Sequence, residues 1–143
     1  MTLRHLLAAA IFLAPVACGK PEPTLPQKPQ ILTDRNSIGF GQEYGSGTYI
    51  GTKPPESLLI MNKGLDNLHI DDVSLVGAKE ITMDPIASND IKGNDHTFIR
   101  FFFEPKAEGV FKATVTINSN ADNEPHKAIE ISGKGVKAPD AGP

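Results

Sequence analysis

The alternation of hydrophobic and polar residues is clearest between Thr97 and Asn120, a stretch that we interpret as two β-strands joined by a short turn. Apolar side chains occupy the odd-numbered positions of both strands. A period of two, rich in aromatic and β-branched residues, is typical of strands with one buried face. Pro105 cannot donate a ladder hydrogen bond and should end the first strand, and Gly109 should open the second. The pattern predicts an antiparallel hairpin at the centre of the fold.

The rest of the chain contains shorter runs of the same kind, separated by Gly, Pro, Asn and Asp. Between Leu68 and Val76 two apolar pairs are out of phase, and one extra residue at Asp71 or Asp72 restores their alignment, which predicts a β-bulge. No segment after the N-terminal twenty residues has helical periodicity. About seven short strands at this spacing predict an all-β, antiparallel, immunoglobulin-like β-sandwich. The other predicted strands lie in 31–40, 57–62, 81–83 and 128–133, with a short one near Tyr49 and Ile50. The predicted inward residues outside the hairpin are Ile38, Phe40, Leu58, Ile60, Leu68, Ile70, Ile129 and Ile131.

Residues 1–17 have the three parts of an export signal. Arg4 supplies the positive start, an apolar run from Leu6 to Ala17 follows, and small residues lead into Cys18. The run is about a dozen residues long, which is shorter than the roughly 20 needed to span a membrane. A buried helix of the folded domain is the alternative, but the proline-rich segment that follows would detach it from the core. We therefore expect a cleaved signal peptide.

The end of this signal, APVACG at 14–19, resembles the lipobox of bacterial lipoproteins. The resemblance implies cleavage before Cys18, diacylation of its thiol and acylation of the new amino terminus. It also implies a lipid anchor at the bacterial cell envelope, and Gly19 fits sorting to the outer membrane, with the protein facing the periplasm or the surface. Ordinary cleavage after Ala17 would instead leave a soluble exported protein with a free thiol. The single cysteine, found here and nowhere else, favours the lipid.

Proline-rich and small-residue segments bound the folded part of the chain. Residues 18–30 are the predicted tether. Its residues 20–30 include four prolines and should form an extended, polyproline-like segment that reaches about 35 Å at ~3.1 Å per residue. Residues 137–143 predict a disordered tail. One domain over 31–136 remains.

Five motifs follow one another in order through this domain. They are IGFG (38–41), LLIMNKG (58–64), LHIDDVSLVG (68–77), FFFEPKAEGVFKATVTINSN (101–120) and IEISGKG (129–135). Together they resemble the ASH/HYDIN-type domain, whose bacterial copies are often described as choice-of-anchor D. The resemblance covers roughly 31–136 and implies an immunoglobulin-like sandwich that serves, loosely, in protein–protein assembly. The 42–56 loop is several residues longer than is usual in that family.

Composition and motif spacing argue against several functional classes. The net charge is −3 and the 14 basic residues are scattered, so no nucleic-acid footprint is expected. One cysteine allows neither an intramolecular disulfide nor a cysteine-based metal site within one chain. His69, His96 and His126 are expected to be separate and exposed, and neighbouring Asp71 and Asp72 should point to opposite faces. We expect no enzyme, cofactor, metal or small-molecule substrate.

The polar stretch 118–124 allows two interpretations. Its several side-chain oxygens could bind Ca²⁺ weakly, but they lack the ordered spacing of a calcium loop. A plain turn is therefore the better interpretation.

Aromatic residues on the solvent side of the predicted hairpin are the first candidates for binding. Phe98 and Phe102 should share an outward face with Leu59 and Met61. Long loops or a curled edge strand would cover them in one interpretation. In the other they form an exposed apolar patch that binds a partner.

These expectations lead to two hypotheses. The first is a non-enzymatic, membrane-tethered lipoprotein, anchored through Cys18, that presents its sandwich to an unidentified envelope protein. The second is a soluble, exported adhesion or carbohydrate-binding sandwich that uses the 42–56 loop, with Tyr44 and Tyr49 as the contact surface. A small hydrolase with an unrecognised site is a remote third.

Overall fold

The computed structural model describes residues 24–41 and 47–139, and within these ranges the regular structure consists of β-strands. The strands alternate buried and exposed residues, as expected for chains packed on one face. Their bounds are β1 Ile31–Thr33, β2 Ser37–Phe40, β3 Thr48–Tyr49, β4 Pro55–Asn62, β5 Leu68–Gly77, β6 Ile81–Met83, β7 Asp90–Ile91, β8 His96–Phe103, β9 Gly109–Ser119 and β10 His126–Val136.

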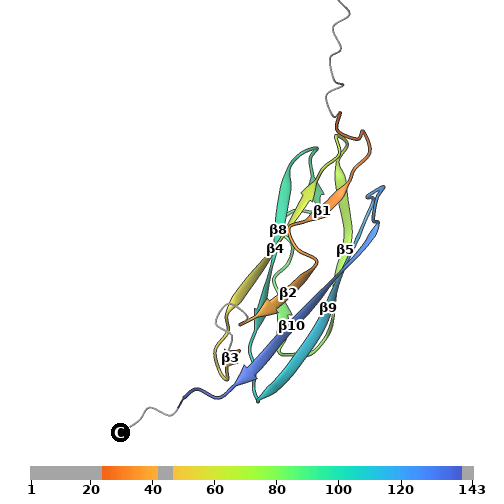
Figure 1. The fold of residues 1–143 in the computed structure, drawn as a ribbon. Helices are drawn as coiled ribbons and strands as arrows, with labels where there is room; N and C mark the ends of the chain where they lie inside the picture. The colour runs from red at the N-terminus through yellow and green to blue at the C-terminus, as the bar shows by residue number, and fades with distance from the viewer. Residues whose placement is uncertain (1–23, 42–46, 140–143) are drawn as a thin grey trace, which may run out of the picture.

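The strands form two packed sheets (Figure 1). Sheet A has the order β1-β4-β8-β6, and sheet B has the order β2-β10-β9-β5-β7, with β3 also paired to β10. The predicted all-β, immunoglobulin-like sandwich is confirmed. The described residues contain ten strands rather than about seven, because pieces of two or three residues such as β7 lack a recognisable pattern. Two pairings are parallel, those of β2 and β3 with β10, so the sandwich is not purely antiparallel.

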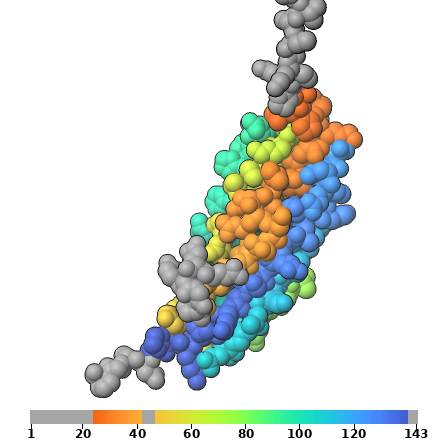
Figure 2. Space-filling view, viewed as in Figure 1, coloured from red at the N-terminus to blue at the C-terminus, as the bar shows by residue number. Residues whose placement is uncertain are grey.

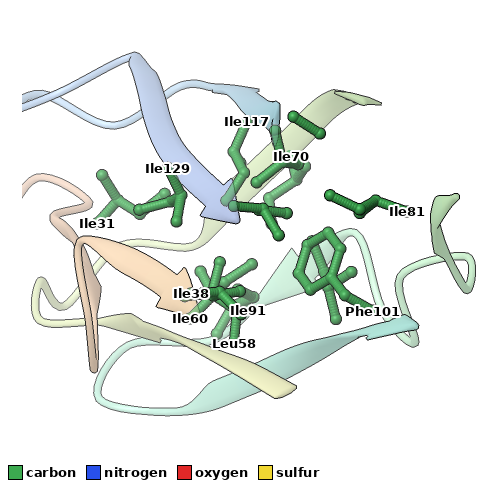
Figure 3. Packing of buried hydrophobic residues seen from close by; sticks show 14 of the residues in the cluster. Ile31, Ile38, Leu58, Ile60, Ile70, Ile81, Ile91, Phe101, Ile117 and Ile129 are labelled. Atoms are coloured by element: carbon green, nitrogen blue, oxygen red, sulfur yellow. The ribbon is translucent and has the colours of Figure 1, made fainter. Parts of the chain in front are cut away.

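The core lies between the sheets and is made of aliphatic and aromatic side chains that face one another (Figure 3). Every inward residue predicted outside the central stretch is buried. The odd-numbered apolar positions from 99 to 103 and from 113 to 117 are buried too, and Phe111 is half-buried. Phe103 packs against Phe40 and Phe111, each with ring centroids 5.5 Å away. The period-two pattern therefore identified the buried faces correctly.

The predicted hairpin is wrong. β8 pairs with β4 and β6 in sheet A, whereas β9 pairs with β10 and β5 in sheet B. The connection at 104–108 crosses from one sheet to the other, and buried Pro105 accepts a hydrogen bond at its carbonyl from the Gly51 N–H (3.1 Å). The two buried faces oppose each other across the core instead of lying side by side. Alternation reports which face is buried, and it does not report the partner strand.

Strand continuity also differs from expectation at the start of the domain. The single strand expected in 31–40 is split, because the chain leaves sheet A after β1 and enters sheet B at β2. The bulge expected in β5 is confirmed, since the register with β9 shifts between Ile70 and Asp72. Ile91, in the mostly polar stretch between β6 and β8, is buried and belongs to β7.

The last residues of the predicted tether lie against the sandwich. The carbonyls of Pro26, Gln27 and Gln30 accept hydrogen bonds from the loop after β4, at 2.8–3.0 Å. Pro29 is buried and its carbonyl accepts a hydrogen bond from the Asp122 N–H (2.9 Å). Residues 26–30, the end of the predicted tether, are therefore bonded to the sandwich. In Figure 1 this segment lies at one end of the elongated body, and β10 ends at the other.

Candidate partner-binding surfaces

The outward face of sheet A carries a cluster of apolar side chains, here called the Phe98 patch, made of Leu32, Leu59, Met61 and Phe98. Leu59 lies opposite Phe98 across the β4–β8 pair, and Leu32 lies opposite Met61 across the β1–β4 pair. Leu32 is 47% exposed and Phe98 is 45% exposed, while the other two are half-buried. The expected shared outward face of Phe98, Leu59 and Met61 is therefore present, and β1 adds Leu32.

Phe102 lies on the same face but outside this patch. It is half-buried, and the Nζ atom of Lys53 lies 5.0 Å from the centre of its ring, within range of a cation–π contact. Arg100 and Ser57, both exposed and paired with each other, separate Phe102 from Phe98. A partner on the Phe98 patch would meet the Arg100 guanidinium next, and Phe102 only at the margin.

Tyr49, one of the two tyrosines predicted as a second surface, does not join the first surface. It is 40% exposed on β3, beside Val136 of β10 in sheet B. Tyr44 lies outside the described residues. The three candidate contact residues that the structure describes, Tyr49, Phe98 and Phe102, therefore do not form one site.

A histidine and two aspartates meet at the edge of sheet B, where β5 pairs with β7. The Nδ1 atom of His69 lies 2.7 Å from a carboxylate oxygen of Asp90, and its Nε2 atom lies 3.9 Å from one of Asp71. The hydrogen bond with Asp90 raises the pKa of His69 above its ordinary value of 6.5. The expectation of an isolated histidine missed this cluster, because the β5–β7 pairing joins residues 21 positions apart. All three side chains are exposed on a sheet edge, which suits a surface ion pair better than catalysis.

The oxygen-rich turn considered for Ca²⁺ uses its side chains to hold the fold together. Asn123 accepts a hydrogen bond from the Ile31 N–H (2.9 Å) and donates one to the Ile31 carbonyl (2.8 Å). Asn120 accepts one from the His69 N–H (2.7 Å), and Asp122 pairs with Lys28 (2.6 Å). These contacts favour the turn. In the part of the chain that the structure describes, no group of three or more His, Cys, Asp or Glu is placed to hold a metal ion.

Asn62 is a structural residue that the sequence analysis did not single out. Its side chain is fully buried at the end of β4. The amide oxygen accepts hydrogen bonds from the N–H groups of Gln30 and Gly64, and the amide nitrogen donates to the carbonyls of Asp66 and Ile91, all at 2.8–3.2 Å. These four bonds use both N–H donors and both lone pairs of the amide.

Cys18, the predicted lipidation site, lies outside the described residues. Between Thr24 and Pro139, leaving aside 42–46, there is no helix long and apolar enough to cross a membrane.

Comparisons with known proteins show similarity of structure without similarity of sequence. No family model matches the chain, and no curated protein matches it in sequence. A crystal structure of a protein of unknown function from Porphyromonas gingivalis W83 has a TM-score of 0.63 at 17% identity, over 80% of this chain and 50% of that one. The ASH/PapD-like domain 7 of human CEP192 has a TM-score of 0.57 at 13% identity, over 90% of this chain and 100% of that one. The CARDB domain of PF1109 from Pyrococcus furiosus, solved by NMR, has a TM-score of 0.52 at 10% identity, over 78% of this chain and 99% of that one.

At such low identities the similarity shows the fold alone. This chain spans half the length of the Porphyromonas gingivalis protein. Proteases and a glycosidase are also among the matches, and this chain covers 20–31% of each. The class that the fold and the comparisons define is an immunoglobulin-like β-sandwich, similar to an ASH/PapD-like domain and a CARDB domain.

Proposed function

We propose that this chain is a non-enzymatic binding or scaffold module, held at a bacterial envelope membrane by lipid on Cys18, that binds a protein partner on the Phe98 patch. The observation that carries this proposal is the patch itself. Single exposed apolar residues are common on any protein surface, whereas adjacent ones on a flat sheet face point to an interaction site.

The chemistry around the patch supports a protein partner. Its four members come from β1, β4 and β8, which are held in register by ladder hydrogen bonds. Because the sheet is rigid, little conformational entropy is lost when a partner covers these side chains. Arg100, two residues from Phe98 on the same face, adds a charged neighbour at the rim. Aromatic residues, Met and Arg are enriched in protein interfaces.

The docked N-terminal segment limits the distance between domain and anchor. The chain takes eight residue-to-residue steps from Cys18 to Pro26, the first described residue that is bonded to the sandwich. At full extension they span at most about 29 Å. A lipid on Cys18 would therefore keep this end of the domain close to the head groups, with the Phe98 patch on the side of the body. Two or three acyl chains would make the anchoring stable.

The partner surface is tested by replacing Phe98 with Asp. The proteins cross-linked to the detergent-extracted chain are compared by mass spectrometry between wild type and Phe98→Asp. The matched control is Val110→Asp, because Val110 is 67% exposed and belongs to β9 of the other sheet. We expect a partner that is lost from Phe98→Asp and kept by Val110→Asp. A partner set unchanged by Phe98→Asp would exclude the patch.

The anchor is tested by metabolic labelling with a palmitate analogue. We expect the wild-type chain to carry the label and the Cys18→Ser chain to carry none. An unlabelled wild type would refute lipid anchoring and leave an exported soluble module. The binding comparison at Phe98 would still hold in that case, because the two experiments fail independently.

A further inference from the structure

β5 leaves part of its backbone without a neighbour. β7 pairs with β5 at Leu68 and His69, and Asn89 bonds both backbone groups of Ile70. Beyond the bulge the Ala78 N–H donates to the Lys112 carbonyl of β9, so even-numbered residues of β5 face β9. The N–H and C=O groups of residues 73, 75 and 77 then point away from β9. Within the described ranges no backbone hydrogen bond joins them to another segment.

The sequence of this edge, VSLVG at 73–77, contains no charge and no proline. Natural edge strands are usually protected by charges, prolines or a covering segment. Sheet A shows such protection where β4 extends beyond β1, since the Asp34 carboxylate accepts the Leu59 N–H (2.9 Å). On the free edge of β5, Val76 is 72% exposed, and Val73 and Leu75 are only half-buried against the core. The edge is therefore able to pair with another strand.

We propose that β5 pairs with β5 of a second copy of this chain, antiparallel, about a twofold axis at Leu75. In this register Leu75 faces its own equivalent and Val73 faces Gly77 of the second copy. All three positions present backbone groups to each other, which gives about six hydrogen bonds and a sheet continuous across both copies. The half-exposed sides of Val73 and Leu75 are covered at the same time.

Charge complementarity selects this register and this partner. It brings exposed Asp71, at the bulge of one copy, near exposed Lys79, in the turn just after β5 of the second copy, twice by symmetry at the two ends of the new ladder. A shift of one residue would place odd-numbered residues of one copy opposite even-numbered residues of the other. The backbone groups of the even-numbered residues already point toward β9, so the hydrogen bonds between the copies would be lost. A shift of two would place Asp71 opposite Gly77 and lose both charge pairs. A strand from an unrelated protein would need its own match to this charge pattern, whereas the chain supplies one itself.

A charge swap tests the register. Sedimentation velocity of the purified full chain, with Cys18→Ser to remove any lipid, should show a concentration-dependent dimer. Asp71→Lys and Lys79→Asp should each raise the dimer dissociation constant about tenfold, because each opposes like charges twice. The double variant should return it to about the wild-type value. A chain that stays monomeric up to about 1 mM, or single variants that the swap does not rescue, would overturn the proposal.

Disulfide trapping tests the same geometry at close range. Ser74 would lie opposite Val76 of the second copy in a non-hydrogen-bonded pair, with Cα atoms about 4.5 Å apart, which a disulfide can bridge. Ser74→Cys/Val76→Cys in the Cys18→Ser chain should form a covalent dimer with oxidised glutathione. The matched control, Ser37→Cys/Ser57→Cys, carries two cysteines at exposed positions outside β5 and should form little. Equal yields from both, or a β5 edge occupied only by another protein's strand, would refute self-pairing.

Discussion

His69 is a side chain whose protonation the fold alters through neighbouring carboxylates. Its hydrogen bond with Asp90 joins β5 to β7, a two-residue strand at one edge of sheet B. Asp71, at the bulge, adds a second negative charge at 3.9 Å. Both aspartates favour the protonated imidazole, and the Asp90 hydrogen bond is the largest contribution to the raised pKa.

The pKa shift of His69 predicts a pH-dependent contribution to stability. Because the folded-state pKa is higher than the unfolded value of about 6.5, the contribution is fully present below pH 6.5 and is lost as the pH rises through the folded-state pKa. His69→Gln should therefore lower the Tm at about pH 5 and leave it unchanged at about pH 9. Thermal denaturation of both proteins across this range measures the difference. Asp90→Asn should remove most of the effect of His69→Gln, and full additivity of the two substitutions would contradict this account.

β8 and β9 are central strands of the two sheets: β8 is paired on both sides in sheet A and β9 on both sides in sheet B, so they do not form a hairpin. The connection between them passes from sheet A to sheet B, and Phe103 at the end of β8 faces sheet B from sheet A. Gly133 of β10 leaves the space that this ring fills, since a Cβ atom there would lie 2.5 Å from a ring carbon of Phe103. Gly133 of the motif at 129–135 is therefore needed for packing, because the ring that fills its space belongs to β8 of the other sheet.

This contact predicts that Gly133→Ala destabilises the protein by about 1–3 kcal/mol, because the added methyl group displaces a fully buried ring. Urea denaturation measures the change in the free energy of unfolding. Ser132→Ala is the control, since Ser132 is adjacent and half-buried on the other face of β10. It should change stability by no more than about 0.5 kcal/mol. Equal effects of the two substitutions would show that Phe103 moves aside freely.

The two sheets and the N-terminal segment are joined at one end of the molecule by polar side chains rather than by core residues. Asn123, between β9 and β10 of sheet B, bonds both backbone groups of Ile31 in β1 of sheet A. Lys28 and Pro29, just before β1, both contact Asp122. The turn between β9 and β10 therefore holds β1 against the sandwich by hydrogen bonds. Figure 2 shows this juxtaposition, with the earliest described residues beside those near 120.

Asn123→Ala should loosen this closure. Loss of two hydrogen bonds should reduce the free energy of unfolding by about 1–3 kcal/mol and speed amide hydrogen exchange in β1 more than in β9. Hydrogen exchange followed by mass spectrometry gives both readings. Asn36→Ala is the control, because Asn36 is exposed in the crossing between β1 and β2. Unchanged protection of β1 in Asn123→Ala would show that apolar packing alone holds this strand.

The sequence by itself determined the all-β class, nearly all strands longer than three residues, their buried faces and the β5 bulge. Alternation in Leu58, Ile60 and their equivalents is a local signal, because side chains on one strand must satisfy one face. The same signal placed Phe98, Leu59 and Met61 on one outward face, although Leu32 joined them only through the pairing of β1 with β4.

Only the tertiary structure decided which strands are neighbours. It placed β8 and β9 in different sheets, split 31–40 between both, and brought His69 to Asp90 and Asn123 to Ile31. These are pairings of positions far apart in the chain, set by which faces fit together across the core and by hydrogen bonds that a linear pattern does not encode. The alternation of apolar and polar residues along one strand shows which side chains are buried. The strand with which it pairs depends on how the whole sandwich packs.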